Sequence, residues 1–237
     1  LDDAAEQDAF TEKLLVLPHS HFCYAPRGQE PAVASSPCEK NGYVTFGSFN
    51  NFTKVTDEVL AAWAGILRQV PDSRLLLKAD VFGAADSRAY AMERIARAGI
   101  VPERLILRPL SREYLGEYAD MDIALDPFPY PGGGTTCDAL YMGVPVVSYY
   151  TERHSTRFTY SLLANIGLSD LASTSLSDYV ETAVALAGNL DLLDALHREL
   201  RDRMKASPVM DQERYIREME ECYRAIWNAW ESENTSR

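Results

Sequence analysis

The chain has 237 residues, of which 46% are hydrophobic and 24% are charged, and its formal net charge is −12. This composition is ordinary for a soluble globular protein with a substantial core. The negative charge argues against nucleic-acid binding through a basic surface. No apolar run approaches the roughly 20 residues of a membrane span, and the acidic N-terminus does not resemble a signal peptide, so we expect no membrane partner.

Four cysteines are present, at Cys23, Cys38, Cys137 and Cys222. They form no CxxC motif and no His/Cys ligand spacing, which argues against a disulfide framework or a zinc site. His19 and His21 also lack a carboxylate or thiol at metal spacing. We therefore expect reduced thiols in a cytoplasmic protein, with no metal site.

Residues 1–40 show little pattern: residues 11–26 suit one short extended element, and residues 27–42 read as a Pro/Ser/Gly linker. The regular part, residues 41–237, alternates between strands and helices. Short apolar runs predict strands at YVTFGSF, RLLLKA, RLILRPL, DIALD and VPVVSYY. Helical spacing of apolar residues predicts helices after an N-cap at Thr56, at 87–98, at TTCDALYMG, at 156–166, at 177–207 with a break, and at 211–230.

This alternation, with strands rich in Leu, Ile and Val, predicts a parallel α/β sheet covered on both faces, which is a Rossmann-like fold. Ligands bind such sheets at the carboxyl ends of the strands. Candidate residues follow three of the predicted strands, at Asn50, Asn51 and Lys54, at 110–114, and at 131–138. Because these loops meet at one edge of the sheet, we expect them to form one site.

The turn PGGGTT is the strongest candidate for binding. Gly132, Gly133 and Gly134 precede Thr135 and Thr136 at a predicted helix start. Backbone N–H groups and the helix dipole favour an anion there, and the threonine hydroxyls add donors, so we predict a phosphate site. A plain turn whose glycines need positive φ is the alternative. The run is neither a Walker loop nor a GxGxxG motif.

Six other residues are candidates. Asp138, expected in the first helical turn, suits either ribose hydroxyls or the helix dipole. Lys54 suits either a diphosphate or a solvated surface position. Tyr114, next to Arg112, suits either base stacking or packing. His154 and Arg157 lie near a helix start, where the dipole does not explain an arginine, and this favours an anion contact.

Several stretches together resemble one family of proteins: YVTFGSFNNFTKVTDEVLAAWAGILRQVPDSRLLLK, PERLILRP, DIALDPFPYPGGGTTCDALYMGVPVVSY, RHSTR and the segment ASPVMD to YIREMEECYRAIW. They are similar to the O-GlcNAc transferase/SPINDLY family of glycosyltransferases, in its bacterial SPINDLY-like branch. The resemblance runs from about residue 11 to residue 230. It implies a GT-B architecture, in which a nucleotide-sugar lies between two Rossmann-like lobes, and this chain matches the C-terminal lobe.

The resemblance also implies roles for the candidate residues. Lys54, as the catalytic residue, would contact the diphosphate near Asn51; Gly134, Thr135 and Thr136 would cradle it; Asp138 would bind ribose; and Tyr114 would lie beside the base. Relatives often carry a side chain at Gly133 or Gly134, so one phosphate contact is missing here. No metal cofactor is required by these groups.

The family context implies further partners. An N-terminal lobe, which would supply the proposed catalytic histidine, and tetratricopeptide repeats are expected before this segment, with residues 1–40 joining the lobes. The expected reaction transfers a sugar, from UDP-GlcNAc by resemblance, to Ser/Thr hydroxyls of a protein acceptor. GDP-fucose as donor and a non-catalytic nucleotide-binding or interaction module remain alternatives. Tyr223, Trp227 and Trp230 are expected on an apolar surface that is exposed when the other lobe is absent.

Overall fold

The computed structural model describes residues 7–8, 10–26 and 31–235. Its centre is a six-stranded, all-parallel sheet with the order β3-β2-β1-β4-β5-β6. The strands are β1 Thr45–Ser48, β2 Arg74–Lys78, β3 Leu105–Arg108, β4 Ile123–Leu125, β5 Val146–Tyr149 and β6 Ala172–Ser173. The predicted Rossmann-like α/β fold is confirmed. Strand β6 was not predicted, because its two half-buried residues carry too little apolar pattern.

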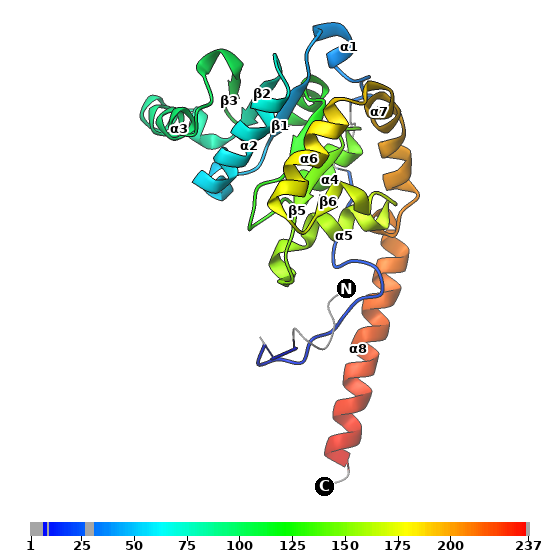
Figure 1. Ribbon diagram of the computed structural model, residues 1–237. Helices are drawn as coiled ribbons and strands as arrows, with labels where there is room; N and C mark the ends of the chain where they lie inside the picture. The colour runs from blue at the N-terminus through cyan, green and yellow to red at the C-terminus, as the bar shows by residue number, and fades with distance from the viewer. Residues whose placement is uncertain (1–6, 9, 27–30, 236–237) are drawn as a thin grey trace.

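Helices cover both faces of the sheet (Figure 1). On one side α2 packs against α6, and on the other α4 contacts α5 and α7. The α-helices are α1 Cys38–Asn41, α2 Asp57–Gln69, α3 Ala85–Arg97, α4 Gly134–Tyr141, α5 Phe158–Asn165, α6 Leu176–Ala187, α7 Leu190–Lys205 and α8 Gln212–Thr235. Short 3₁₀ helices are η2 Phe52–Lys54, η3 Asp80–Phe82, η4 Pro102–Arg104, η5 Tyr114–Asp120, η6 His154–Thr156, η7 Ser169–Leu171 and η8 Pro208–Met210.

Local signals fixed most helix ends. The Thr56 side chain accepts the N–H of Val59 at the start of α2, as an N-cap does. Gly99 ends α3 in the left-handed region, at φ +86°. The predicted break within 177–207 lies between α6 and α7. The prediction of one helix over 156–166 is wrong at its start, because a 3₁₀ turn ending at Thr156 precedes α5.

The core joins the two strands at the centre of the sheet to the helices above them. Trp63 of α2 is fully buried and donates its indole N–H to the hydroxyl of Tyr179 on α6, over 2.9 Å. That hydroxyl donates in turn to the backbone carbonyl of Asp126, over 3.1 Å. Since the buried indole N–H of Trp63 and the buried hydroxyl of Tyr179 both have hydrogen-bond partners, these two side chains connect α2 and α6 to the end of β4 without leaving either group unpaired.

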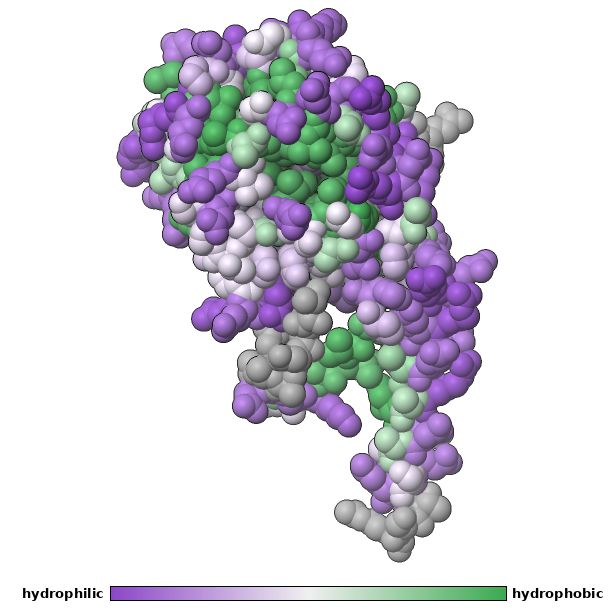
Figure 2. All heavy atoms as spheres, turned by 45° about the vertical axis from the view of Figure 1, so that its right-hand side comes forward, coloured by the Kyte–Doolittle hydropathy of each residue, from purple (hydrophilic) through white to green (hydrophobic). Residues whose placement is uncertain are grey.

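Within the segment before the sheet, residues 10–26 contain no strand. The extended element expected there is therefore not regular β structure. Helix α8 extends away from the body (Figure 1), and Figure 2 shows apolar residues where the N-terminal segment passes it. Tyr223, Trp227 and Trp230 of α8 are exposed, as predicted. Among the helices of the described chain, none combines the length and apolar character needed to cross a membrane.

A buried carboxylate joins the N-terminal segment to the sheet. Asp122, directly before β4, is fully buried and accepts hydrogen bonds from the Ser36 hydroxyl, from the N–H of Cys38 over 2.9 Å and from the N–H of Thr45 over 2.7 Å. Its backbone carbonyl lies 2.8 Å from Nε2 of His197 on α7. Asp122 therefore connects three segments that are far apart in sequence.

Replacing Asp122 with alanine should lower the free energy of unfolding by about 3 kcal/mol, because it leaves two buried N–H groups and a hydroxyl without their acceptor. Urea denaturation followed by circular dichroism measures this loss. The matched control is Asp170→Ala at an exposed position, which should change the free energy of unfolding by no more than about 0.5 kcal/mol. Equal effects of the two substitutions would contradict the proposed anchoring.

Candidate nucleotide-binding site

The candidate site lies where the strand order changes direction. Strands β1 and β4 are neighbours in the sheet, and the chain leaves them toward opposite sides, to β2 and to β5. The loops that follow these two strands therefore diverge and leave a crevice at the carboxyl edge, which is where ligands bind in open α/β sheets. The loop after β1 carries Lys54, and the loop after β4 carries the glycine turn, so the structure brings these two candidates together.

Lys54 contacts the glycine turn directly. Its ammonium donates to the backbone carbonyl of Pro131 over 2.9 Å and to Oδ1 of Asn50 over 3.4 Å, and it lies 4.7 Å from the ring centre of Tyr130. Burial lowers the pKa of Lys54, and the charge of nearby Asp126 opposes that shift. The alternative of a freely solvated surface lysine is therefore wrong. Lys54 is a half-buried cation held at the edge of the crevice.

Asn50 and Asn51 differ in burial and in their hydrogen-bond partners. The buried Asn50 places its side-chain oxygen 3.0 Å from the hydroxyl of Thr135, so it connects Lys54 to the helix start. Asn51 is exposed, and its side chain accepts the N–H of Thr53 at the start of η2. The predicted role of Asn51 near the phosphates stays a prediction. The resemblance assigned a role to Asn51, whereas Asn50 is the asparagine that contacts Lys54 and Thr135; adjacent residues of a loop show no periodicity that would indicate which of them faces the turn.

The three glycines differ in how closely they are packed, and at Gly132 and Gly133 a side chain would have no room. None of them has a positive φ, so the explanation of a plain left-handed turn is wrong. A Cβ at Gly132 would lie 2.3 Å from the hydroxyl of Thr136, and one at Gly133 would lie 2.9 Å from the ring of Phe22. A Cβ at Gly134 would meet nothing within 4 Å. Gly134 is therefore the glycine whose surroundings are open to a ligand.

Helix α4 begins at Gly134 and directs its first backbone N–H groups toward this space. The first N–H bonded back to the turn is that of Cys137, which donates to the carbonyl of Gly133 over 2.9 Å. The preceding N–H groups are those that a helix leaves for a cap or a ligand. The hydroxyls of Thr135 and Thr136 are engaged within the protein, with Asn50 and with Thr159. Anion binding here depends chiefly on backbone amides.

Asp138 and Tyr114 lie together. Asp138 is in the second turn of α4, so the expectation of a first-turn position that favours the dipole is wrong. The hydroxyl of Tyr114, at the start of η5, donates to Oδ2 of Asp138 over 2.7 Å. Tyr24 donates to Oδ1 over 2.9 Å. Arg112 is exposed in the turn before η5. Asp138 is therefore a carboxylate held by two tyrosines next to the open helix start.

Asp126 is a part of this site that the sequence analysis missed. It follows β4 and is buried; it accepts the N–H of Gly132 over 2.6 Å and the hydroxyl of Ser148 over 2.8 Å. Burial raises its pKa, while hydrogen bonds and the charge of Lys54 oppose that shift. The only signal in the sequence was an aspartate directly after an apolar strand, at the carboxyl edge. The carboxylate of Asp126 therefore fixes the conformation of the glycine turn through the N–H of Gly132.

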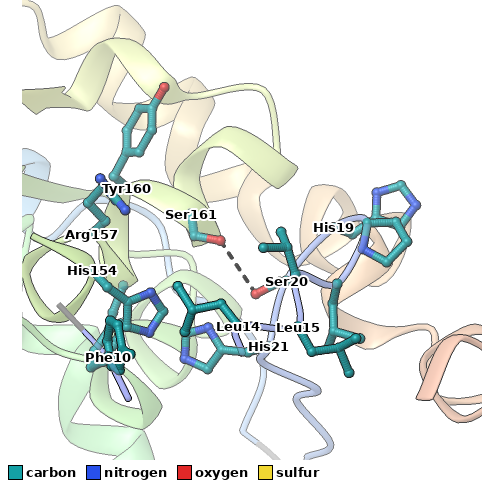
Figure 3. Close-up of a pocket in the computed structure, with 14 residues that line it drawn as sticks. Phe10, Leu14, Leu15, His19, Ser20, His21, His154, Arg157, Tyr160 and Ser161 are labelled. Carbon is teal, nitrogen blue, oxygen red and sulfur yellow. Dashed lines mark hydrogen bonds between the residues drawn. The ribbon is translucent and has the colours of Figure 1, made fainter. Parts of the chain in front are cut away.

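His154 and Arg157 line a neighbouring pocket of about 420 Å³, which lies between the N-terminal segment and α5 (Figure 3). The rings of His154 and His21 face each other, with centres 5.4 Å apart, and burial, followed by the charge of His154, lowers the pKa of His21. The guanidinium of Arg157 donates to the carbonyl of Glu152. Phe158 lies 5.9 Å from Tyr130, so this pocket adjoins the crevice. The predicted anion contact of these two residues stays a prediction.

The described residues contain no group of three or more His, Cys, Asp and Glu side chains arranged to hold a metal ion. All four cysteines are free. Lys54 and the backbone amides of α4 are positive groups that lie next to the open helix start. This arrangement suits an anionic ligand such as a diphosphate.

Comparisons with known proteins show the family to which this chain is similar. The profile of glycosyl transferase family 41 matches residues 38–219. The probable UDP-N-acetylglucosamine–peptide N-acetylglucosaminyltransferase SPINDLY of Solanum lycopersicum is 40% identical over 92% of this chain, and SEC of Arabidopsis thaliana, with the same enzyme description, is 32% identical over 92%. This chain spans about a quarter of the length of these relatives, at 24% and 23%.

Among solved structures, a mutant of the O-GlcNAc transferase of Thermobaculum terrenum has a TM-score of 0.86 and 32% identity, over 95% of this chain and 43% of that protein. TarM of S. aureus has a TM-score of 0.63 at 11% identity, over 93% of this chain and 42% of that one, which shows a shared fold alone. The predicted fold, a lobe of a GT-B glycosyltransferase, is confirmed. Since the family profile covers most of the chain, this protein belongs to glycosyl transferase family 41.

Proposed function

We propose that this chain is the donor-binding half of a protein O-glycosyltransferase, and that it binds a nucleotide-diphosphate sugar, UDP-GlcNAc by analogy with its relatives. The observation that carries the proposal is the contact of the Lys54 ammonium with the carbonyl of Pro131, over 2.9 Å, beside the open start of α4. It places a half-buried cation and a set of helix N-terminal amides around one space. A diphosphate has the charge and size to use both.

The proposed chemistry is the departure of the nucleoside diphosphate from the sugar as a Ser/Thr hydroxyl attacks. Negative charge grows on the leaving diphosphate in the transition state. Lys54 and the amides of α4 are already oriented, so they stabilise that charge without reorganising. Protein groups supply the positive charge in this scheme, and a metal ion is not required. Part of the acceptor groove and the proposed catalytic histidine would come from the N-terminal lobe, which lies outside these 237 residues.

The other end of the nucleotide would lie toward Asp138 and Tyr114. A carboxylate accepts hydrogen bonds well from the two hydroxyls of a ribose. Tyr114, half-buried at the start of η5, offers a ring for contact with the base. These roles place diphosphate, ribose and base in order along the carboxyl edge of the sheet, from Lys54 to Tyr114.

Lys54→Met should weaken UDP binding by about tenfold or more, because it removes the cation while keeping an unbranched side chain of similar length. Isothermal titration of the 237-residue chain measures the change. Lys40→Met in α1, an exposed position, is the matched control and should leave affinity unchanged. Unchanged affinity in Lys54→Met would contradict a diphosphate at this position.

The identity of the donor is tested by titrating the same chain with UDP and with GDP. If UDP-GlcNAc is the donor, UDP should bind at least about tenfold more tightly, since the base is the part of the two ligands that differs. A clear preference for GDP would overturn the UDP-GlcNAc assignment in favour of a GDP-fucose donor. Binding of neither nucleotide would contradict the donor-binding role altogether.

The transferase proposal and the alternative of a non-catalytic nucleotide-binding module predict different results for a longer protein that also carries the N-terminal lobe. There Lys54→Ala should reduce sugar transfer to a peptide by at least about a hundredfold, as loss of one preorganised charge contact does. Association with the acceptor should persist. If the wild-type two-lobe protein has no transferase activity but still binds its partner, the interaction-module alternative holds instead.

A further inference from the structure

Asp138 receives hydrogen bonds from two tyrosines that reach it from different parts of the chain. Tyr114 approaches from η5 and donates to Oδ2 over 2.7 Å. Tyr24 approaches from the segment before the sheet and donates to Oδ1 over 2.9 Å, across a sequence separation of 114 residues. Each carboxylate oxygen therefore has one tyrosine donor. The carboxylate plane is fixed from both sides.

Tyr24 is itself fixed by the lobe. Its backbone N–H donates to the carbonyl of Val209 in η8 over 2.8 Å, and Val209 is fully buried. Its ring centre lies 5.7 Å from that of Tyr141 on α4. Two residues earlier, Phe22 packs over Gly133. The segment around Tyr24 is therefore packed onto the lobe at the start of α4, although it precedes the regular part of the fold.

The hydroxyl of Tyr24 acts only as a donor to Asp138. Burial, followed by the charge of Asp138 and the hydrogen bond to it, raises the pKa of Tyr24 far above its usual range. The phenol therefore keeps its proton at physiological pH and does not repel the carboxylate. An ionised carboxylate has about four acceptor positions on its two oxygens, so two remain after the tyrosines are counted.

We propose that Tyr24 is a positioning residue of the nucleotide site, which holds the carboxylate of Asp138 in the orientation that accepts the hydroxyls of a nucleoside diphosphate's ribose. This assignment rests on the proposed function. Tyr24 does not touch the ligand in this scheme. It acts by keeping one oxygen of Asp138 engaged and the other acceptor positions directed toward the space beside α4. The hydrogen bond between Tyr24 and Asp138 already exists in the free protein, and such preorganisation strengthens binding.

The test is Tyr24→Phe, which removes one oxygen atom and keeps the ring. Titration calorimetry of the 237-residue chain should show about five- to tenfold weaker binding of the nucleotide that the wild type prefers, UDP or GDP. Inorganic pyrophosphate, which has no ribose, should bind within about twofold of wild type. Tyr43→Phe is the matched control: Tyr43 precedes β1 at the opposite edge of the sheet, next to Arg74, and its loss should leave both ligands unaffected.

A double-mutant cycle tests whether Tyr24 acts through Asp138. The double variant Tyr24→Phe, Asp138→Ala should bind the nucleotide as weakly as Asp138→Ala alone. Additive losses, an equal loss of nucleotide and pyrophosphate affinity, or no loss in Tyr24→Phe would each overturn the assignment. If the wild type binds pyrophosphate but neither UDP nor GDP, that result contradicts the proposed function itself, and it is distinguishable from a failure of the Tyr24 assignment.

Discussion

A buried carboxylate at the end of β4 is the constraint on which the candidate site depends. Asp126 lies in the interior, where an ionised group is costly unless donors surround it. The backbone N–H of Gly132 and the hydroxyl of Ser148 meet that need. The turn must fold back to bring Gly132 to Asp126, and this fold leaves room for no side chain at Gly132. The shape of the turn therefore follows from the need to place hydrogen-bond donors around the carboxylate of Asp126.

The same constraint places Lys54. The charge of Asp126 raises the pKa of Lys54 against the effect of burial, so the two groups support each other's ionised forms. The ammonium bonds the Pro131 carbonyl of the turn that Asp126 shapes. The loops after β1 and β4 are therefore joined before any ligand arrives. A diphosphate entering this crevice would meet charges whose positions the protein has already fixed.

The sequence predicted the features that repeat or that have a local signature. Five apolar runs predicted the five longer strands, and the cap at Thr56 predicted the start of α2. Sequence patterns could not predict features that depend on contacts between distant segments. Whether Asn50 or Asn51 faces the turn, and why Gly132 must be glycine, depend on packing across the sheet. The predicted helix start at Thr156 is wrong for a local reason, because the hydroxyl of Thr156 bonds within its own loop.

The pattern-poor segment before the sheet was the largest gap, because sequence periodicity carries no information about a chain that lies on a surface without regular structure. Residues 1–40 read as a linker, yet two of them reach the candidate site. Phe22 fills the space above Gly133, and Tyr24 bonds Asp138. Hydrogen bonds to Asp122 and Val209 attach this segment at both the sheet and η8. The physical boundary of the candidate site thus lies upstream of the boundary that strand and helix patterns define, because a segment that precedes the sheet contributes side chains to it.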